Sequence, residues 1–135
     1  MFVDASAIVA ILTEEDEAQV LAEALESAAK PITSPIAVWE AAASISRKTG
    51  RRADTELPAI LTFLDVARVG IEPVDMKVAA AAVAAFDRYG RRSGHGAELN
   101  MGDCFAYAFA KQGDLALLYK GKDFPQTDVR RPKPR

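Results

Sequence analysis

The first twelve residues, MFVDASAIVAIL (residues 1–12), join a short apolar run to a segment rich in alanine and isoleucine, with one carboxylate between them. The run from Met1 to Asp4 has the length of a short strand. Residues 5–12 have the composition and the apolar spacing of a helix. The stretch therefore predicts a strand that leads directly into a helix, with Asp4 at the junction.

The same alternation continues along the chain. Further strands are expected at PITS (residues 31–34), VGIEPV (69–74) and LALLY (115–119), with a short edge strand at TDV (127–129). Helices are expected at 5–12, 17–29, 35–50, 55–67, 75–90 and 99–113. Parallel neighbours need long crossover connections, so this order predicts an α/β fold with a short, mainly parallel central sheet covered by helices on both faces.

Turn and cap residues place the ends of several helices. Ser34 followed by Pro35 predicts an N-cap and the first helical residue. Gly50, Gly90 and Gly113 predict helix ends. These signals agree with the helical segments inferred from apolar spacing.

Length and composition indicate one domain. The chain has 135 residues, half of them hydrophobic, which is enough for a core without disulfides. We expect a single domain over residues 1–130 and a flexible tail at 131–135. The only cysteine, Cys104, has no internal partner, and no signal peptide or membrane-spanning run is evident, so we expect a cytoplasmic protein with no membrane partner.

Four acidic residues follow strands or begin helices in this fold. They are Asp4, Glu40, Asp103 and Asp123. In a parallel α/β sheet the strand C-termini and helix N-termini share one edge, so we expect all four at the same rim. Taken singly, each has a simpler interpretation: Asp4 and Asp103 as helix caps, Glu40 as a surface residue and Asp123 as part of a turn.

Together these acids predict a cation site. Carboxylates held close together in a poorly solvated place disfavour full ionisation, and a bound cation removes that conflict. All the predicted ligands are oxygens, with no matching histidine or cysteine cluster, so Mg²⁺ or Mn²⁺ fits better than zinc.

Basic residues gather elsewhere. The loop RYGRRSGHGAELN (residues 88–100) carries Arg88, Arg91 and Arg92, and we expect these three to contact a polyanion. The basic group at residues 47–52 is interpreted as a solvated surface. His95 is expected to be a surface or RNA-contacting residue rather than a catalyst.

Two further assignments concern burial. Cys104 follows Asp103, whose charge disfavours the thiolate, so it is read as a packing residue. The aromatic residues Trp39, Phe105, Tyr107 and Phe109 lie at helical positions and are expected mainly in the core, with base stacking as the less favoured role.

Four segments carry a family resemblance. MFVDASAIVAIL, SPIAVWEAAASI, LNMGDCFAYAFAK and LLYKGKDFPQTDV together resemble the PIN-domain ribonucleases, above all the VapC-type toxins of bacterial toxin–antitoxin pairs. The resemblance covers essentially the whole chain. It implies a three-layer α/β/α sandwich, Mg²⁺-dependent endoribonuclease activity on RNA, a homodimer, and neutralisation by a small VapB-type antitoxin.

The resemblance also implies roles for the acids. Asp4, Glu40 and Asp103 match the acidic triad, and Asp123 is the expected fourth acid, although many relatives carry it where this chain has Gly121. We expect Asp4 and Asp103 to be the principal metal ligands. Glu40 would complete the shell or orient the attacking water, and Asp123 would hold a second metal or a water. Asp128 is a rival for the position of fourth acid, and Ser6 either supports Asp4 or caps the helix.

Two other functions remain open at this point. One is a catalytically silent RNA- or protein-binding module on the same fold, which a cleavage assay separates from a nuclease. The other is an Mg²⁺-dependent phosphotransfer or phosphatase domain. An Asp-x-Asp phosphatase needs a second acid where this chain has Ser6, which disfavours that reading.

Overall fold

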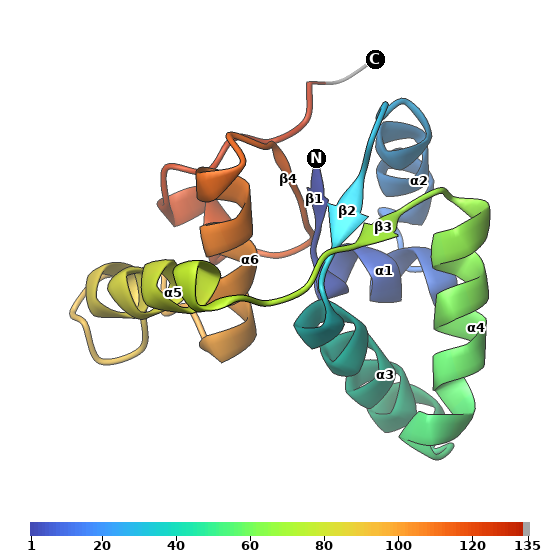
Figure 1. Ribbon diagram of the computed structural model, residues 1–135. Helices are drawn as coiled ribbons and strands as arrows, with labels where there is room; N and C mark the ends of the chain where they lie inside the picture. Colours follow the sequence, from blue (N-terminus) through green and yellow to red (C-terminus); the bar gives the residue numbers. More distant parts are fainter. Residues whose placement is uncertain (134–135) are drawn as a thin grey trace.

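A four-stranded parallel sheet forms the centre of the computed structural model, which describes residues 1–133 (Figure 1). The strands are β1 (Phe2–Val3), β2 (Ile32–Thr33), β3 (Gly70–Ile71) and β4 (Leu117–Leu118), in the order β3-β2-β1-β4. Phe2 lies opposite Ile32 on one side and Leu117 on the other. Thus β1 is central, and its C-terminal end is flanked by two further strand ends.

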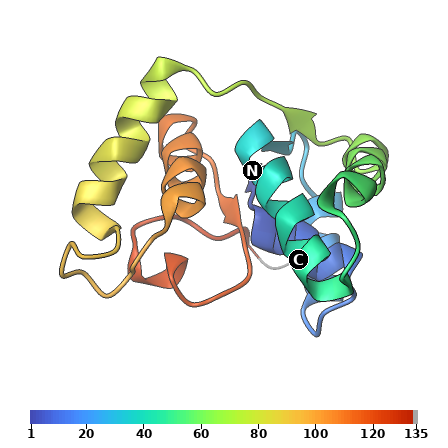
Figure 2. The same ribbon diagram turned by 90° about the horizontal axis from the view of Figure 1, so that it is seen from below.

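Helices cover both faces of this sheet, as predicted. They are α1 (Ala5–Leu12), α2 (Ala18–Glu26), α3 (Pro35–Thr49), α4 (Ala53–Val66), α5 (Met76–Tyr89) and α6 (Met101–Gln112), and the turn η1 (Phe124–Gln126) follows β4. Helices α5 and α6 lie on one side of the sheet, and α1 to α4 lie on the other (Figures 1 and 2). The expected α/β/α sandwich is confirmed.

The core is built where β1 meets α6. Phe2 is fully buried, and its ring stacks on Phe109 with 5.0 Å between the ring centroids. Burial of one such side chain contributes about 1.5–3 kcal/mol to stability. This contact fixes α6, and with it Asp103 at its start, against the central strand.

Local signals set the helix ends as expected. Ser34 Oγ accepts a hydrogen bond from the Ala37 amide at 3.2 Å, so Ser34 is the N-cap of α3 and Pro35 its first residue. Gly50 ends the same helix with φ of +74°, a left-handed conformation that favours glycine. Gly90 and Gly113 also end helices, but with negative φ.

The edge strand predicted at residues 127–129 does not form, so that prediction is wrong. The segment returns beside β4, where the Leu117 amide donates to the Arg130 carbonyl at 2.8 Å. Within residues 1–133 the sheet nevertheless has only the four strands given above. Asp128 is bound by side chains of α5 and α6, and this anchors the segment without a strand ladder.

The structure describes part of the predicted C-terminal tail at residues 131–135. Of the predicted tail, Arg131 packs with its guanidinium 4.5 Å from the Tyr119 ring centroid, and residues 134–135 lie outside the described residues. That residues 1–130 form one domain stays a prediction. Among residues 1–133, no helix combines the length and the apolar character needed to cross a bilayer.

Candidate active site

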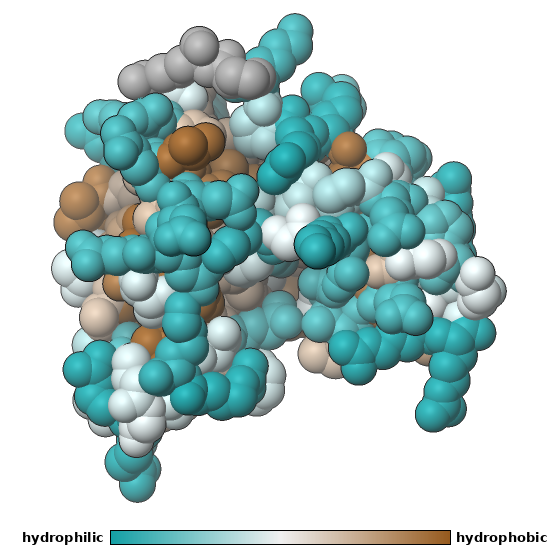
Figure 3. All heavy atoms as spheres, turned by 180° about the vertical axis from the view of Figure 1, so that it is seen from behind, coloured by the Kyte–Doolittle hydropathy of each residue, from teal (hydrophilic) through white to brown (hydrophobic). Residues whose placement is uncertain are grey.

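An acidic pocket lies at the C-terminal end of the sheet, between α3 and α6. Figure 2 looks toward this end, and the space-filling view shows the molecule indented there (Figure 3). The pocket has a volume of about 230 Å³, and its lining includes Asp4, Glu40 and Asp103. Strands β2 and β3 follow on one side of β1 and β4 lies on the other, so the strand order reverses between β1 and β4, as at the ligand-binding crevice of many open α/β sheets.

Asp4 is positioned by the junction between β1 and α1. Its backbone is extended, and its Oδ2 accepts hydrogen bonds from the Ser6 amide at 3.0 Å and from Ser6 Oγ at 2.6 Å. Asp4 therefore caps α1 and also lines the pocket. Its side chain is almost fully buried, and burial raises the pKa of its carboxyl, while the Ser6 hydrogen bonds act in the opposite direction.

Asp103 is held by a reciprocal capping box at the start of α6. Its amide donates to Asn100 Oδ1 at 2.8 Å, and its own Oδ2 accepts from the Asn100 amide at 3.1 Å. One carboxylate oxygen thus fixes the side chain. Asp103 both caps the helix and contributes charge to the pocket.

Glu40 lies in the second turn of α3 and reaches across to the backbone of α6. A Cβ built on Gly102 would overlap the carboxylate of Glu40. Glycine at position 102 therefore gives Glu40 its place beside Asp103. This role of Gly102 could not be inferred from the sequence, because the approach of α3 to α6 is not visible in either segment.

Burial and neighbouring charges raise the pKa of two of these three carboxyl groups. Burial, then the charges of Asp4 and Asp103, raise the pKa of Glu40 to about 7. Burial and the charge of Asp4 likewise raise the pKa of Asp103 to about 7, against the lowering effects of the Asn100 amide and Arg91. The pocket therefore holds more negative charge than its surroundings compensate near neutral pH.

Asp123 lies at the margin of this group. It is exposed in the loop after β4, and its charge contributes to the raised pKa of Asp103. It does not line the pocket. Gly121 has φ of +128°, which side-chain-bearing residues rarely adopt, so an acid at position 121 would require a different loop.

Asp128 is occupied elsewhere. Its Oδ1 accepts from Tyr107 Oη at 2.6 Å, and its Oδ2 lies 3.1 Å from Lys111 Nζ. The Tyr107 hydrogen bond and Lys111 lower the pKa of Asp128 to about 2. Lys111 is eight residues beyond Asp103, about 12 Å along α6, so Asp128 lies away from the acidic pocket.

A polar network ties the loop after β4 to the acidic end of the sheet. Ser6 Oγ, which donates to Asp4, accepts from the Lys120 amide at 3.0 Å. Glu15 binds both Lys120 Nζ and Lys48 Nζ at 2.6 Å. Ser6 therefore serves both roles considered for it: it supports Asp4 and forms part of the N-terminal cap of α1.

The basic loop approaches the pocket through Arg91, whose charge acts on Asp103. Arg88 lies with its guanidinium 4.6 Å from the Tyr89 ring centroid, and Arg92 is exposed. The ring of His95 packs edge-on against Tyr89, and its Nδ1 accepts from the Ala97 amide at 3.1 Å. These contacts give His95 a role in shaping the loop.

The predicted burial of Cys104 is confirmed, whereas the predicted burial of Trp39 is wrong. Cys104 is buried, and its surroundings together with Asp103 raise its thiol pKa to about 11, which confirms a packing role. Tyr107 and Phe109 are buried as predicted and Phe105 partly so. Trp39 is not a core residue: it is 68% exposed and lines the acidic pocket. It faces outward because nothing in the described chain packs over that face of α3.

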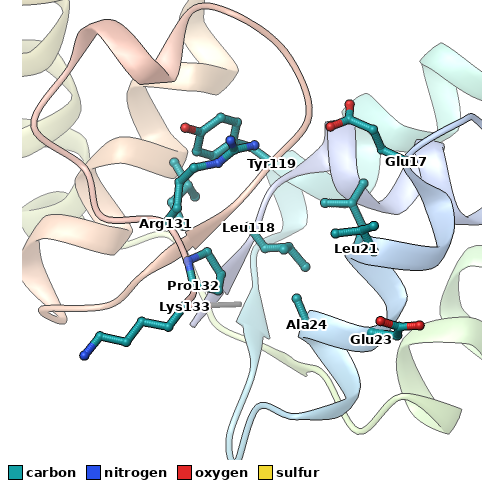
Figure 4. A pocket seen from close by; sticks show the side chains of 11 residues that line it. Glu17, Leu21, Glu23, Ala24, Leu118, Tyr119, Arg131, Pro132 and Lys133 are labelled. Carbon is teal, nitrogen blue, oxygen red and sulfur yellow. The ribbon is translucent and has the colours of Figure 1, made fainter. Parts of the chain in front are cut away.

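A larger pocket of about 520 Å³ lies between α2, β4 and the C-terminal segment (Figure 4). Glu17 and Glu23 come from one side of it, and Arg131 and Lys133 come from the other. Both of these glutamates are exposed. This pocket lacks the buried, converging carboxylates of the acidic pocket.

Comparison with protein families identifies the family of the chain. The PIN domain matches residues 1–130. The chain belongs to the PIN domain family. A VapC ribonuclease of Rhizobium meliloti is 40% identical, over 95% of this chain and 98% of that protein. Ribonuclease VapC42 of Mycobacterium tuberculosis is 41% identical, over 96% and 97% of the two chains.

Solved structures agree on the PIN fold. The crystal structure of Mycobacterium tuberculosis VapC20, described as a Sarcin-Ricin loop cleaving toxin, has a TM-score of 0.76 at 18% identity and covers 98% of each chain. A toxin–antitoxin complex from Klebsiella pneumoniae contains a chain with a TM-score of 0.67 at 20% identity, covering 99% of this chain and 98% of that one. The resemblance to VapC-type PIN proteins drawn from the sequence is confirmed.

Proposed function

We propose that this PIN protein is an Mg²⁺-dependent endoribonuclease toxin that hydrolyses RNA phosphodiester bonds and is neutralised by a VapB-type antitoxin. The observation that carries the proposal is the acidic pocket, where carboxylates from three separate elements converge and the charge of Asp4 raises the pKa of both Glu40 and Asp103. The names of the VapC relatives support RNA as the substrate.

The donor set of the pocket fits a hard divalent cation. Within residues 1–133, no three acidic, histidine or cysteine side chains already form a closed metal-binding group. Mg²⁺ does not require one, because it usually retains several waters and binds proteins through one or two carboxylates together with substrate phosphate. Asp4 and Asp103 would hold the ion, and Mn²⁺ shares these preferences for oxygen.

The roles of the chain's own residues follow from their surroundings. A bound Mg²⁺ would offset the negative charge of the phosphodiester and make water more acidic. Ser6 and Asn100 fix the orientation of Asp4 and Asp103. Glu40, whose pKa is about 7 without metal, accepts a proton from the attacking water as the new P–O bond forms. The bond to the leaving oxygen breaks, and that oxygen takes up a proton from solvent water.

An apolar surface beside the acidic pocket supports the antitoxin part of the proposal. A pocket between α5 and α6 is lined by Ala79, Ala82, Phe86, Met101 and Phe105, among others. Phe86 and Met101 are more than half exposed. Small alanine side chains permit close approach of an apolar helix, and Met101 lies two residues from Asp103, so a docked antitoxin helix could direct a basic side chain to the acids. A homodimer, expected from the resemblance, belongs to the same proposal.

The decisive experiment is a cleavage assay with purified protein. Structured and single-stranded RNA should be cleaved internally with Mg²⁺ or Mn²⁺ and remain intact with EDTA. Coexpression with the neighbouring small open reading frame should give a stable complex that suppresses cleavage and toxicity. Absence of metal-dependent cleavage would favour the catalytically silent binding module. Cleavage without protection by the neighbouring gene product would leave a nuclease outside a toxin–antitoxin pair.

We predict that the fourth acid affects turnover more than metal affinity. Asp123 is exposed and acts on Asp103 from outside the pocket, so Asp123→Asn should lower the cleavage rate by about tenfold while Mg²⁺ affinity stays within about twofold. Cleavage kinetics and calorimetric metal titration measure the two effects.

Asp128→Asn is the matched control for this prediction. It should leave cleavage unchanged but lower stability, because the low pKa of Asp128 marks a carboxylate stabilised by Tyr107 and Lys111. That stabilisation is present at neutral pH and is lost as pH falls from about 4 toward 2. Reduced cleavage in Asp128→Asn with unchanged cleavage in Asp123→Asn would transfer the role to Asp128.

We predict that the basic loop contributes RNA affinity rather than the chemical step. Replacement of Arg88, Arg91 and Arg92 by glutamine should raise the RNA concentration for half-maximal cleavage by about tenfold or more, with little change in the maximal rate. Each lost phosphate contact should flatten the dependence of log affinity on log salt by about 0.7. The control is replacement of Lys30, Arg68 and Lys77 by glutamine, which removes the same number of positive charges from residues outside the acidic pocket. An unchanged salt slope would assign the loop to another surface.

A further inference from the structure

Trp39 occupies an unusual position for a tryptophan. It is the only tryptophan of the chain, its side chain is 68% exposed, and it lines the pocket that contains Asp4, Glu40 and Asp103. Tryptophan is highly buried on average, and exposed aromatic surface beside a polar site is typical of a binding surface. The indole is therefore available to a ligand that enters the acidic pocket.

One face of α3 connects Trp39 to Arg47. Residues 39, 40, 43, 44 and 47 follow helical spacing, and all five line the pocket. Apart from Glu40, whose carboxylate lies at Gly102, this face presents only the small side chains of Ala43 and Ser44 between the indole and Arg47. Eight residues correspond to about 12 Å along the helix axis. The face thus presents an aromatic ring and a cation beside the carboxylates, with small side chains between them.

Arg47 differs from the other basic residues at 47–52. Lys48 is paired with Glu15, Arg51 with Glu56 and Arg52 with Asp54, at 2.6–2.7 Å. Arg47 alone of the four has no salt bridge or side-chain hydrogen bond within residues 1–133. Arg47 is exposed, as expected for this group, and its unpaired charge is available at the pocket that it lines.

We propose that Trp39 and Arg47 position single-stranded RNA at the acidic pocket, with a base stacked on the indole and a backbone phosphate bound by the guanidinium. The inference rests on the proposed function and deepens it. Single-stranded RNA carries bases and phosphates on one strand, which matches an aromatic group and a cation on one helix face. A protein segment that bound here instead would need an apolar side chain for the indole and an acidic side chain for Arg47, about 12 Å apart. The experiments below distinguish this alternative from RNA.

Trp39 is its own reporter, because all tryptophan fluorescence of the chain comes from this residue. A single-stranded RNA octamer of mixed sequence, added to Asp103→Asn protein with Mg²⁺, should quench or shift the emission in a saturable way. The corresponding RNA duplex, whose bases are already stacked, should have a much smaller effect at equal phosphate concentration. Saturable RNA binding, measured by anisotropy of a labelled octamer, without a change in tryptophan emission would overturn the proposal.

Variants in the same background separate stacking from charge. Trp39→Ala should weaken octamer binding by about 5- to 100-fold, and Trp39→Phe should restore most of the affinity. Arg47→Ala should reduce the salt slope by about 0.7, whereas Arg47→Lys should keep it. Met76→Ala and Arg68→Ala are matched controls, since these exposed residues lie outside the acidic pocket, and both should bind like the parent.

The outcomes distinguish this inference from the proposed function. Unchanged RNA affinity in Trp39→Ala overturns the inference, while metal-dependent cleavage by the unmodified protein leaves the nuclease assignment intact. Emission changes with RNA, in a protein that cleaves none, support the inference and remove the proposed catalysis. Emission changes with a peptide of the neighbouring gene product, and none with RNA, overturn the inference in favour of a protein contact.

Discussion

Asp103→Asn should reduce Mg²⁺-dependent RNA cleavage on the order of 10³-fold and leave a protein that is folded and more stable without metal. The activity falls because a charged oxygen ligand is replaced by a neutral amide in a site that must stabilise a negatively charged transition state. The fold persists because the amide oxygen of asparagine can still accept the Asn100 hydrogen bond that completes the capping box. Cleavage kinetics, circular dichroism and thermal melting measure these effects.

The gain in stability depends on pH. Glu40 and Asp103 have pKa values of about 7 in the folded protein, against 4.5 and 3.8 as ordinary values. The folded state therefore binds more protons than the unfolded state between about pH 4 and 7. Stability without metal should fall as pH rises through this range and level off above it. Asp103→Asn removes one of the interacting charges, so it should flatten this fall and stabilise the protein by about 1–3 kcal/mol near pH 8.

Asp4→Asn provides a second test at the buried end of the pocket. It should also abolish cleavage, and it should ease the repulsion that Asp4 exerts on both Glu40 and Asp103. Added Mg²⁺ should stabilise the unmodified protein above pH 7 and have much less effect on either variant. Asp4→Asn protein prepared in parallel is the control for contaminating nuclease, since it should show no cleavage. If Asp103→Asn retained cleavage while this control showed none, the assignment of Asp103 would be contradicted.

The sequence predicted the parts of this fold that depend on local pattern. Short apolar runs bounded by turn signals located all four strands, and the order of strands and helices required parallel pairing. That topology places strand ends and helix starts at one edge, so Asp4 and Asp103 could be expected near each other from their local positions alone. Their capping roles, considered as alternatives, coexist with their place in the pocket.

Features that depend on packing between distant segments were not predictable in the same way. Trp39 has the spacing of a core residue, but its exposure depends on the absence of a covering element over that face of α3. The 127–129 segment has strand-like composition, yet Tyr107 and Lys111 bind Asp128 and a strand ladder does not develop. Asp128 could not be separated from Asp123 by sequence position, because both follow β4 within a few residues.

Gly102→Ala should reduce cleavage by about 10²-fold with little loss of stability. The added methyl group would occupy the position of the Glu40 carboxylate, which is the end of a side chain and can move away. Alanine is also the better helix former, by about 1 kcal/mol, so α6 should tolerate the change. Gly70→Ala is the matched control, since its Cβ would meet Ile32 Cγ2 at 3.7 Å, an ordinary contact.

A double-mutant cycle decides whether Gly102 acts through Glu40. If the methyl group only displaces the Glu40 carboxylate, Gly102→Ala should cost almost nothing further in a Glu40→Gln background, and the two losses should be strongly non-additive. The displaced carboxylate should also become more acidic, because it leaves the burial and the neighbouring charges that raise its pKa to about 7. Without metal, the fall in stability between about pH 4 and 7 should therefore be shallower in Gly102→Ala than in the unmodified protein. Additive losses with an unchanged pH dependence of stability would show that Gly102 serves the backbone of α6 and not the position of Glu40.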